Sequence, residues 1–122
     1  MIRLSILENA EQKWISADSV SFSQECDVLV IGVGTAGSFA AIAAAREGAR
    51  VIAVEKDENI GGMPVNGRVT TYYYGARGGT FEEIDGVARE RGALFAAGPL
   101  QEDLKQTVLT EYLERAGVEL IC

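Results

Sequence analysis

The glycines at positions 32, 34 and 37 form the sequence pattern that most directly indicates a chemical function for this chain. They make up a GxGxxG pattern that follows an apolar run, residues 28–31, and opens an alanine-rich segment. An acid, Glu55, stands 23 positions after the first glycine, at the end of a second apolar run. A strand, a glycine turn, a helix and a second strand ending in an acid predict a βαβ unit that binds a dinucleotide.

Each glycine has a separate task in that chemistry. Gly32 permits a tight turn, Gly34 leaves room for a pyrophosphate beside backbone N–H groups, and Gly37 lets the helix sit against the strand. The start of the helix adds free N–H donors and a partial positive charge of about +0.5. Glu55 can accept hydrogen bonds from both hydroxyls of an adenosine ribose and would repel a 2′-phosphate. The alternatives are a glycine turn that serves packing alone and a solvated acid at a strand end.

A second glycine pair, Gly61 and Gly62, follows the acid by a few residues. The first pattern alone serves NAD and FAD equally well. NAD has no need of a second pair here, whereas FAD has an extended pyrophosphate and ribityl chain that a second backbone segment could approach. The pair therefore favours FAD, with a plain surface turn as the alternative.

Composition and charge narrow the class of protein. The chain has 122 residues, enough for one domain, and is 48% hydrophobic and 24% charged, as in ordinary soluble domains. Its formal net charge of −7, without clustered Lys or Arg, argues against nucleic acid or an anionic membrane as a partner. No apolar run approaches the roughly 18–20 residues that span a bilayer, and the first residues are too short for a signal segment. The cytoplasm is the expected compartment.

Cysteine and histidine, two residue types that ligate metals and act in catalysis, are scarce in this chain. Cys26 and Cys122 form no CxxC pair and are expected to be reduced thiols. The chain contains no histidine, which excludes a His-based general base, catalytic triad or zinc site within it. No metal site is expected.

Residues 1–25 are expected to form an arm or a short hairpin, with strands near 3–7 and 13–16. Residues 26–122 are expected to form an α/β domain with a Rossmann-like parallel β-sheet of the FAD/NAD(P)-binding type. Its strands are predicted at Val28–Ile31, Val51–Val54 and Val118–Ile121, in the spatial order third, second, first. Because the first strand is apolar at four consecutive positions, it is predicted to be buried on both faces.

Three helices are predicted around these strands. The first runs from about Thr35 to Glu47 and ends at Gly48. The second begins at a capping box formed by Thr80 and Glu83. The third follows residue 99 and ends at residue 117.

A long irregular stretch, residues 56–79, lies between the second strand and the second helix. It holds Arg68, Tyr72, Tyr73, Tyr74 and Arg77 among several glycines. Loops of this length are usually functional in compact domains. A mobile or partner-facing loop is a better expectation for these side chains than catalysis, and no catalytic residue is assigned.

At residues 27–37, 54–56 and 61–63 the chain resembles the N-terminal FAD-binding part of FAD-dependent oxidoreductases with a glutathione-reductase-like nucleotide fold. The similarity is closer to a subgroup with a Gly-Gly-Met sequence and later elements like residues 78–84 and 116–119. The resemblance is specific for FAD and unspecific for substrate. It implies FAD as the cofactor, held by Gly32, Val33, Gly34, Thr35, Ala36, Gly37, Glu55, Lys56, Gly61, Gly62 and Met63.

Members of this family continue past the third strand with further strands, a substrate domain and a segment that touches the flavin ring. The domain is therefore expected to be incomplete at its C-terminus. Three interpretations stay open: an N-terminal FAD-binding piece of an oxidoreductase that is not catalytically complete alone, a small subunit of a split flavoenzyme, and a non-catalytic module that binds an adenine nucleotide. In the first two, a missing domain or a second chain would cover the strand at residues 28–31.

Overall fold

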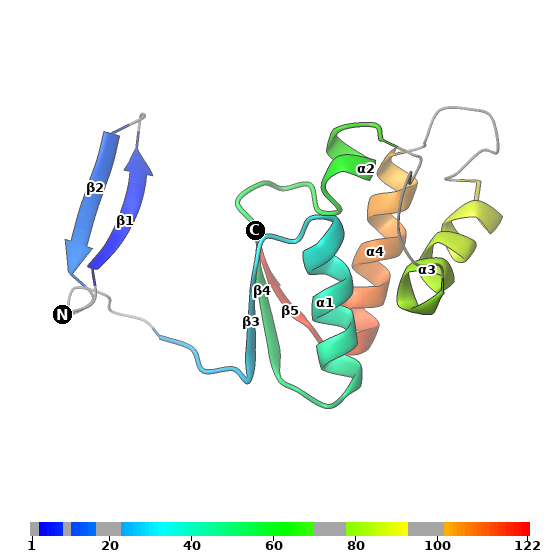
Figure 1. Ribbon diagram of the computed structural model, residues 1–122, viewed down its shortest axis with the longest axis horizontal. Helices are drawn as coiled ribbons and strands as arrows, with labels where there is room; N and C mark the ends of the chain where they lie inside the picture. Colours follow the sequence, from blue (N-terminus) through cyan, green and yellow to red (C-terminus); the bar gives the residue numbers. More distant parts are fainter. Residues whose placement is uncertain (1–2, 9–10, 17–22, 70–77, 93–101) are drawn as a thin grey trace.

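The computed structural model describes residues 3–8, 11–16, 23–69, 78–92 and 102–122. Strands β1 (Arg3–Glu8) and β2 (Glu11–Ser16) pair in antiparallel fashion, so the predicted N-terminal hairpin is present. This hairpin forms a sheet of its own and shares no ladder with the second sheet (Figure 1).

The second sheet is parallel and has three strands in the order β3-β4-β5. These strands are β3 (Val28–Ile31), β4 (Val51–Val54) and β5 (Glu119–Ile121). In the register, Val28 pairs with Val51, and Ile52 pairs in turn with Glu119. The predicted strand order and the Rossmann-like α/β class are both confirmed. β3, the first strand of this sheet along the chain, lies at one edge, and β4 lies in the middle.

The helices of the described residues lie between the strands of this sheet along the chain, one between β3 and β4 and the others between β4 and β5. They are α1 (Thr35–Arg46), α2 (Met63–Asn66), α3 (Gly79–Glu90) and α4 (Glu102–Ala116). α1 ends as predicted, with Gly48 at a φ of +91° just past its end. None of the helices in the described ranges is both long and apolar enough to cross a membrane.

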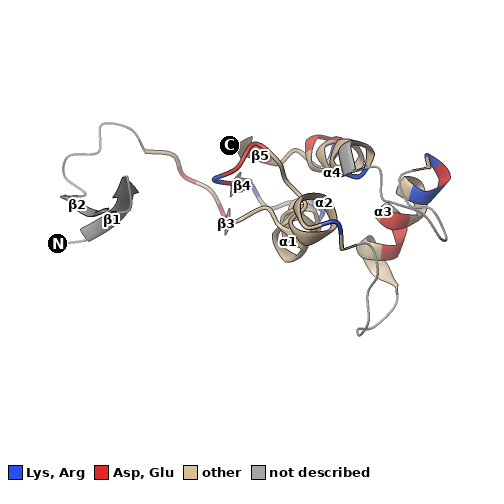
Figure 2. Cartoon of the chain, turned by 90° about the horizontal axis from the view of Figure 1, so that it is seen from above, with Lys and Arg blue, Asp and Glu red and all other residues tan. Residues whose placement is uncertain are grey.

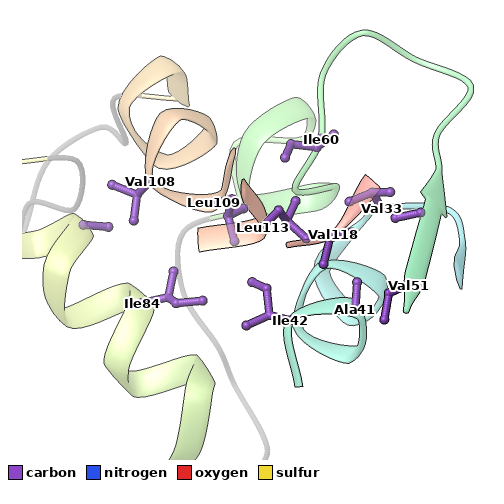
Figure 3. Packing of buried hydrophobic residues seen from close by; sticks show 12 residues of the cluster. Val33, Ala41, Ile42, Val51, Ile60, Ile84, Val108, Leu109, Leu113 and Val118 are labelled. Carbon is purple, nitrogen blue, oxygen red and sulfur yellow. The ribbon is translucent and has the colours of Figure 1, made fainter. Parts of the chain in front are cut away.

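The hydrophobic core lies between the sheet and the helices α1, α3 and α4 (Figure 3). α1 carries mostly small residues, so that its backbone comes close to β3 and β4. α4 packs against α1, and α3 packs on α4 as the helix farthest from the sheet (Figure 1). α3 carries four acidic residues and one basic residue, whereas α1 carries Arg46 as its one charged residue (Figure 2). The fully buried members of the core include Val33, Ile42, Ile60, Ile84, Leu109 and Leu113.

One face of the parallel sheet is open within the described residues, and this corrects the prediction that β3 is buried on both faces. Val28 and Val30 face the helices and pack against the core, whereas Leu29 and Ile31 are 54% and 82% exposed. The reason is that all the described helices that contact the sheet, α1 and α4, belong to the layer on one side (Figure 1). An apolar run indicates that both faces of a strand favour burial. It does not indicate which segment would pack on each face.

Two local predictions are wrong. α3 begins at Gly79 after Gly78, and no side chain caps it, so Thr80 and Glu83 form no capping box. The Glu83 carboxylate binds the Arg46 guanidinium instead, at 2.8 and 2.9 Å. The stretch 56–79 is also not irregular throughout, because residues 63–66 form the short helix α2 with a proline in its first turn.

A buried ion pair joins α3 to α4. The Lys105 ammonium and the Asp85 carboxylate are hydrogen-bonded, and their side chains are nearly inaccessible to solvent. The Lys105 ammonium also lies 6.0 Å from the centre of the Phe39 ring of α1. Burial of two charges is tolerated only because each neutralises the other, so the pair ties the position of α3 to that of α4.

We expect Asp85→Ala to destabilise the fold by about 3–5 kcal/mol, because it leaves a buried ammonium without its partner. The double variant Asp85→Leu with Lys105→Met removes both charges and should recover most of that loss. Urea denaturation at one fixed protein concentration measures both. A cost below about 1 kcal/mol for Asp85→Ala would show that water or another group compensates Lys105.

A second expectation concerns the assembly state of the chain. The outer edge of β3 has no partner strand among the described residues, and the adjoining sheet face is apolar. Such edges pair with other chains, so the 122-residue chain alone should dimerise or aggregate. Light scattering should show less association for Ile31→Lys than for Ala43→Lys, which adds the same charge on an exposed position of α1. A monodisperse wild-type monomer would contradict this expectation.

Candidate functional site at the glycine turn

The glycine turn joins the end of β3 to the start of α1. Gly32 has a φ of +92°, a conformation that favours glycine, and its N–H donates to the Val54 carbonyl oxygen at 2.8 Å. This bond extends the β3-β4 ladder by one step, so the turn begins at the carboxyl edge of the sheet. Gly34 then caps the helix in an extended conformation.

Gly37 is required by packing, as expected from the pattern. A Cβ on this residue would overlap the Gly32 carbonyl oxygen and would lie 3.2 Å from the Val30 Cγ1. The first turn of α1 therefore rests directly on the backbone of the glycine turn.

Gly34 is different, because the fold itself places little demand on it. Its φ of −76° is open to any residue, and a Cβ here would meet only the Gly62 Cα, at an ordinary 3.7 Å. The absence of a side chain therefore leaves room that the described residues do not fill.

The glycine pair Gly61–Gly62 is hydrogen-bonded to the glycine turn. The Gly61 N–H donates to the Val33 carbonyl oxygen at 2.7 Å, and the Thr35 hydroxyl lies 3.4 Å from the Gly61 carbonyl oxygen. Both glycines have positive φ, +100° and +64°, and a Cβ on Gly62 would lie 2.9 Å from the Thr35 nitrogen. The pair is thus no plain surface turn, and the two glycine segments form one backbone unit.

Glu55 extends from the end of β4 to this unit. Its Oε2 accepts the Val33 N–H at 2.7 Å, and its Oε1 accepts the N–H groups of Lys56 at 2.9 Å and Asp57 at 3.4 Å. The Val33 N–H is the main cause that lowers the pKa of the Glu55 carboxyl, and partial burial opposes it. Because the pKa is lowered on folding, Glu55 stabilises the fold above its unfolded pKa, and this contribution is lost as the pH falls through the lowered pKa.

Backbone donors are gathered at the start of α1. The N–H groups of Gly34, Thr35 and Ala36 have no backbone acceptor among the described hydrogen bonds, as expected in a first helical turn. The helix macrodipole adds a partial positive charge at the same place. Together these groups can bind an anion.

Ser38 belongs to this site and was missed from the sequence. Its side chain is fully buried, and its hydroxyl lies 2.8 Å from the Gly34 carbonyl oxygen and 3.1 Å from the Val33 carbonyl oxygen. A small polar residue directly after the third glycine, in an otherwise apolar helix, is the signal that could have identified it.

The remaining predicted site residues lie around the turn in different ways. Val33 points inward and is 0% exposed in the core (Figure 3), so its side chain leaves the turn free. Lys56 extends into solvent, and Met63 is 59% exposed at the start of α2. Arg68, which was not among the predicted cofactor-binding residues, follows α2 at a φ of +55°, in the left-handed region. Residues 72–74 and Arg77 lie outside the described residues.

Comparisons with known proteins identify the family of the chain. The sequence model of the FAD dependent oxidoreductase family matches residues 27–122, which begin just before β3 and include α4 and β5. Digoxin reductase from Eggerthella lenta is 41% identical over 78 residues, which are 63% of this chain and 14% of that protein. The tRNA uridine 5-carboxymethylaminomethyl modification enzyme MnmG from Clostridium kluyveri is 37% identical over 87 residues, 70% of this chain and 13% of that protein.

Among solved structures, that of THI4 from Thermovibrio ammonificans superposes with a TM-score of 0.52 at 20% identity, over 79% of this chain and 38% of that one. At this identity the likeness supports the fold alone. The chain spans about one-seventh of the length of the two curated relatives. Since the family match covers most of the chain, the protein belongs to the FAD-dependent oxidoreductase family, and residues 27–122 form part of an FAD-binding region.

Proposed function

We propose that the glycine turn holds the ADP half of FAD. The pyrophosphate would receive hydrogen bonds from the N–H groups of Gly34, Thr35 and Ala36, with Gly62 forming the opposite wall. The observation that carries this proposal is the space at Gly34. The fold tolerates a Cβ there in both conformation and contact, so a ligand gives the better reason for a glycine.

Glu55 would contact the adenosine ribose. A carboxylate offers about four acceptor sites, and three backbone N–H groups already approach them. One site remains for a ribose hydroxyl, and a second hydroxyl would compete with the long 3.4 Å bond from Asp57. The negative charge disfavours a 2′-phosphate at the same place.

The chain supplies binding and orientation, while the flavin ring of FAD supplies the redox chemistry once bound. Lys56 and Met63 complete the predicted cofactor-binding set. Within the family, we propose a glutathione-reductase-like nucleotide fold of the Gly-Gly-Met subgroup, supported by residues 61–63 and 116–119.

For the whole protein, we propose an FAD-dependent oxidoreductase of which this chain is the N-terminal FAD-binding portion, not catalytically complete alone. Residues 1–25 would be an arm and residues 26–122 the FAD-binding domain. The exposed face and edge of β3 support a further domain or second chain as its cover. The two unpaired cysteines support the cytoplasm as the compartment. A small subunit of a split flavoenzyme and a non-catalytic nucleotide-binding module are the alternatives.

Ligand choice tests the ribose contact. The chain should bind FAD and ADP more tightly than NADP, and NAD at least about tenfold more tightly than NADP, because NAD and NADP differ only in the 2′-phosphate beside Glu55. Isothermal titration calorimetry measures all four. Tighter binding of NADP than of ADP would contradict the assignment of Glu55.

Alanine substitutions at three glycines test the pyrophosphate contact. Gly34→Ala should leave the circular dichroism spectrum and unfolding midpoint unchanged but weaken ADP binding by about 1–3 kcal/mol, because its methyl group occupies the ligand's space. Gly37→Ala should unfold the domain through its clash with Gly32. Gly86→Ala, in open space within α3, is the matched control and should stabilise slightly without changing binding. Wild-type ADP affinity in Gly34→Ala would overturn the proposed pyrophosphate site.

A further inference from the structure

Both backbone groups of Val33 are held by the rest of the protein. Its N–H donates to the Glu55 Oε2 at 2.7 Å. Its carbonyl oxygen accepts the Gly61 N–H at 2.7 Å and lies 3.1 Å from the Ser38 hydroxyl. Since the Val33 side chain is buried in the core as well, this residue is restrained from four directions.

The restraint determines where the next donor points. The described peptide bonds are all trans, so the Val33 carbonyl and the Gly34 N–H, which share one planar peptide group, point in opposite directions. The carbonyl faces Ser38 and Gly61, on the inner side of the turn. The Gly34 N–H is therefore directed outward, toward the room left by the missing side chain of Gly34.

Glu55 controls the preceding peptide group. The Val33 N–H belongs to the plane that joins Gly32 to Val33, and Gly32 has the φ of +92° that only a flexible residue adopts readily. The carbonyl oxygen of this plane lies against Gly37, so the bond to Glu55 is the hydrogen bond that restrains its opposite side. Without that bond the plane can tilt and shift the Val33–Gly34 plane. The carboxylate is the group in the described structure that accepts this N–H.

We propose that Glu55 is a positioning residue for the phosphate-binding amides: by holding the Val33 N–H, it fixes the turn before any nucleotide binds. This task is separate from a contact with ribose, and its consequence for ligands rests on the function proposed above. Glu55 thereby couples the ribose end of the site to its pyrophosphate end through one backbone residue.

A positioning role and a purely electrostatic role of Glu55 predict opposite changes in pyrophosphate affinity when Glu55 is replaced. A carboxylate near a pyrophosphate repels it, so removal of the charge alone should strengthen pyrophosphate binding. Removal of the restraint should weaken it. Inorganic pyrophosphate is the decisive probe, because it has no ribose that Glu55 could contact.

The experiment uses the full chain with the variants Glu55→Gln and Glu55→Ala, and with Glu58→Gln as the matched control. Glu58 is an exposed acid three residues further on, and its substitution by Gln removes the same charge. Amide hydrogen exchange at single-residue resolution follows the Val33 N–H without ligand. The Gly32 N–H, which donates to Val54, reports whether the fold is intact.

We expect the Val33 amide to exchange at least about tenfold faster in Glu55→Ala, with Gly32 unchanged. We also expect pyrophosphate binding about fivefold weaker in Glu55→Ala, an intermediate loss in Glu55→Gln, and no loss in Glu58→Gln. Unchanged Val33 exchange, or pyrophosphate binding that is equal or stronger in both Glu55 variants, overturns the proposal. If the wild type binds neither ADP nor pyrophosphate, the proposed function fails, while the exchange rates still decide whether Glu55 holds the turn.

Discussion

The hydrogen bond from the Gly61 N–H to the Val33 carbonyl oxygen is the interaction on which the site depends. It joins two glycine segments that are far apart in the sequence, one between β3 and α1 and the other between β4 and α2. The contact is possible only because the approaching residues lack side chains, as the short distances from a Cβ at Gly62 to Thr35 and Gly34 show. Once the bond forms, the backbone of both segments becomes one rigid surface at the carboxyl edge of the sheet.

The helices of the domain pack against that surface and hold it in place. α1 rests on the turn through Gly37, and α4 reaches the second glycine pair through Leu109, whose Cδ1 would lie 2.9 Å from a Cβ on Gly61. The buried pair Lys105–Asp85 then ties α3 to α4. The loop residues of the candidate site are thus held by packed helices and strands, which is the usual way in which a scaffold positions a site. The opposite face of the sheet carries no such layer in the described residues.

The parts of this architecture that depend on local sequence could be predicted. The strand at Val28–Ile31, the end of α1 at Gly48 and the role of Gly37 follow from apolar runs and from glycine's conformational freedom. The strand order followed from the doubly wound pattern. Two of the predictions that failed depended on distant partners. Glu83 binds Arg46 on another helix in preference to a cap, and the exposure of Ile31 depends on where the helices lie.

The site shows the same division. The spacing of Gly34 and Glu55 predicted that the acid lies beside the glycine turn, and the structure brings the Glu55 carboxylate to that turn. Their contact with a ligand stays a proposal. Ser38 was not found, since its importance lies in two carbonyl groups that only the folded turn brings to its hydroxyl. The bond between Glu55 and Val33 also could not be foreseen, because spacing indicates that an acid reaches the turn without showing which atom it binds.

In the proposed complex, the first turn of α1 receives the pyrophosphate of FAD. The most direct measurement is an NMR titration of the isotopically labelled chain with FAD, following each backbone amide. We expect the largest shifts at Gly34, Thr35 and Ala36, with little change in α3, which lies farthest from the sheet (Figure 1). Saturable FAD binding that leaves these three amides unperturbed would contradict it.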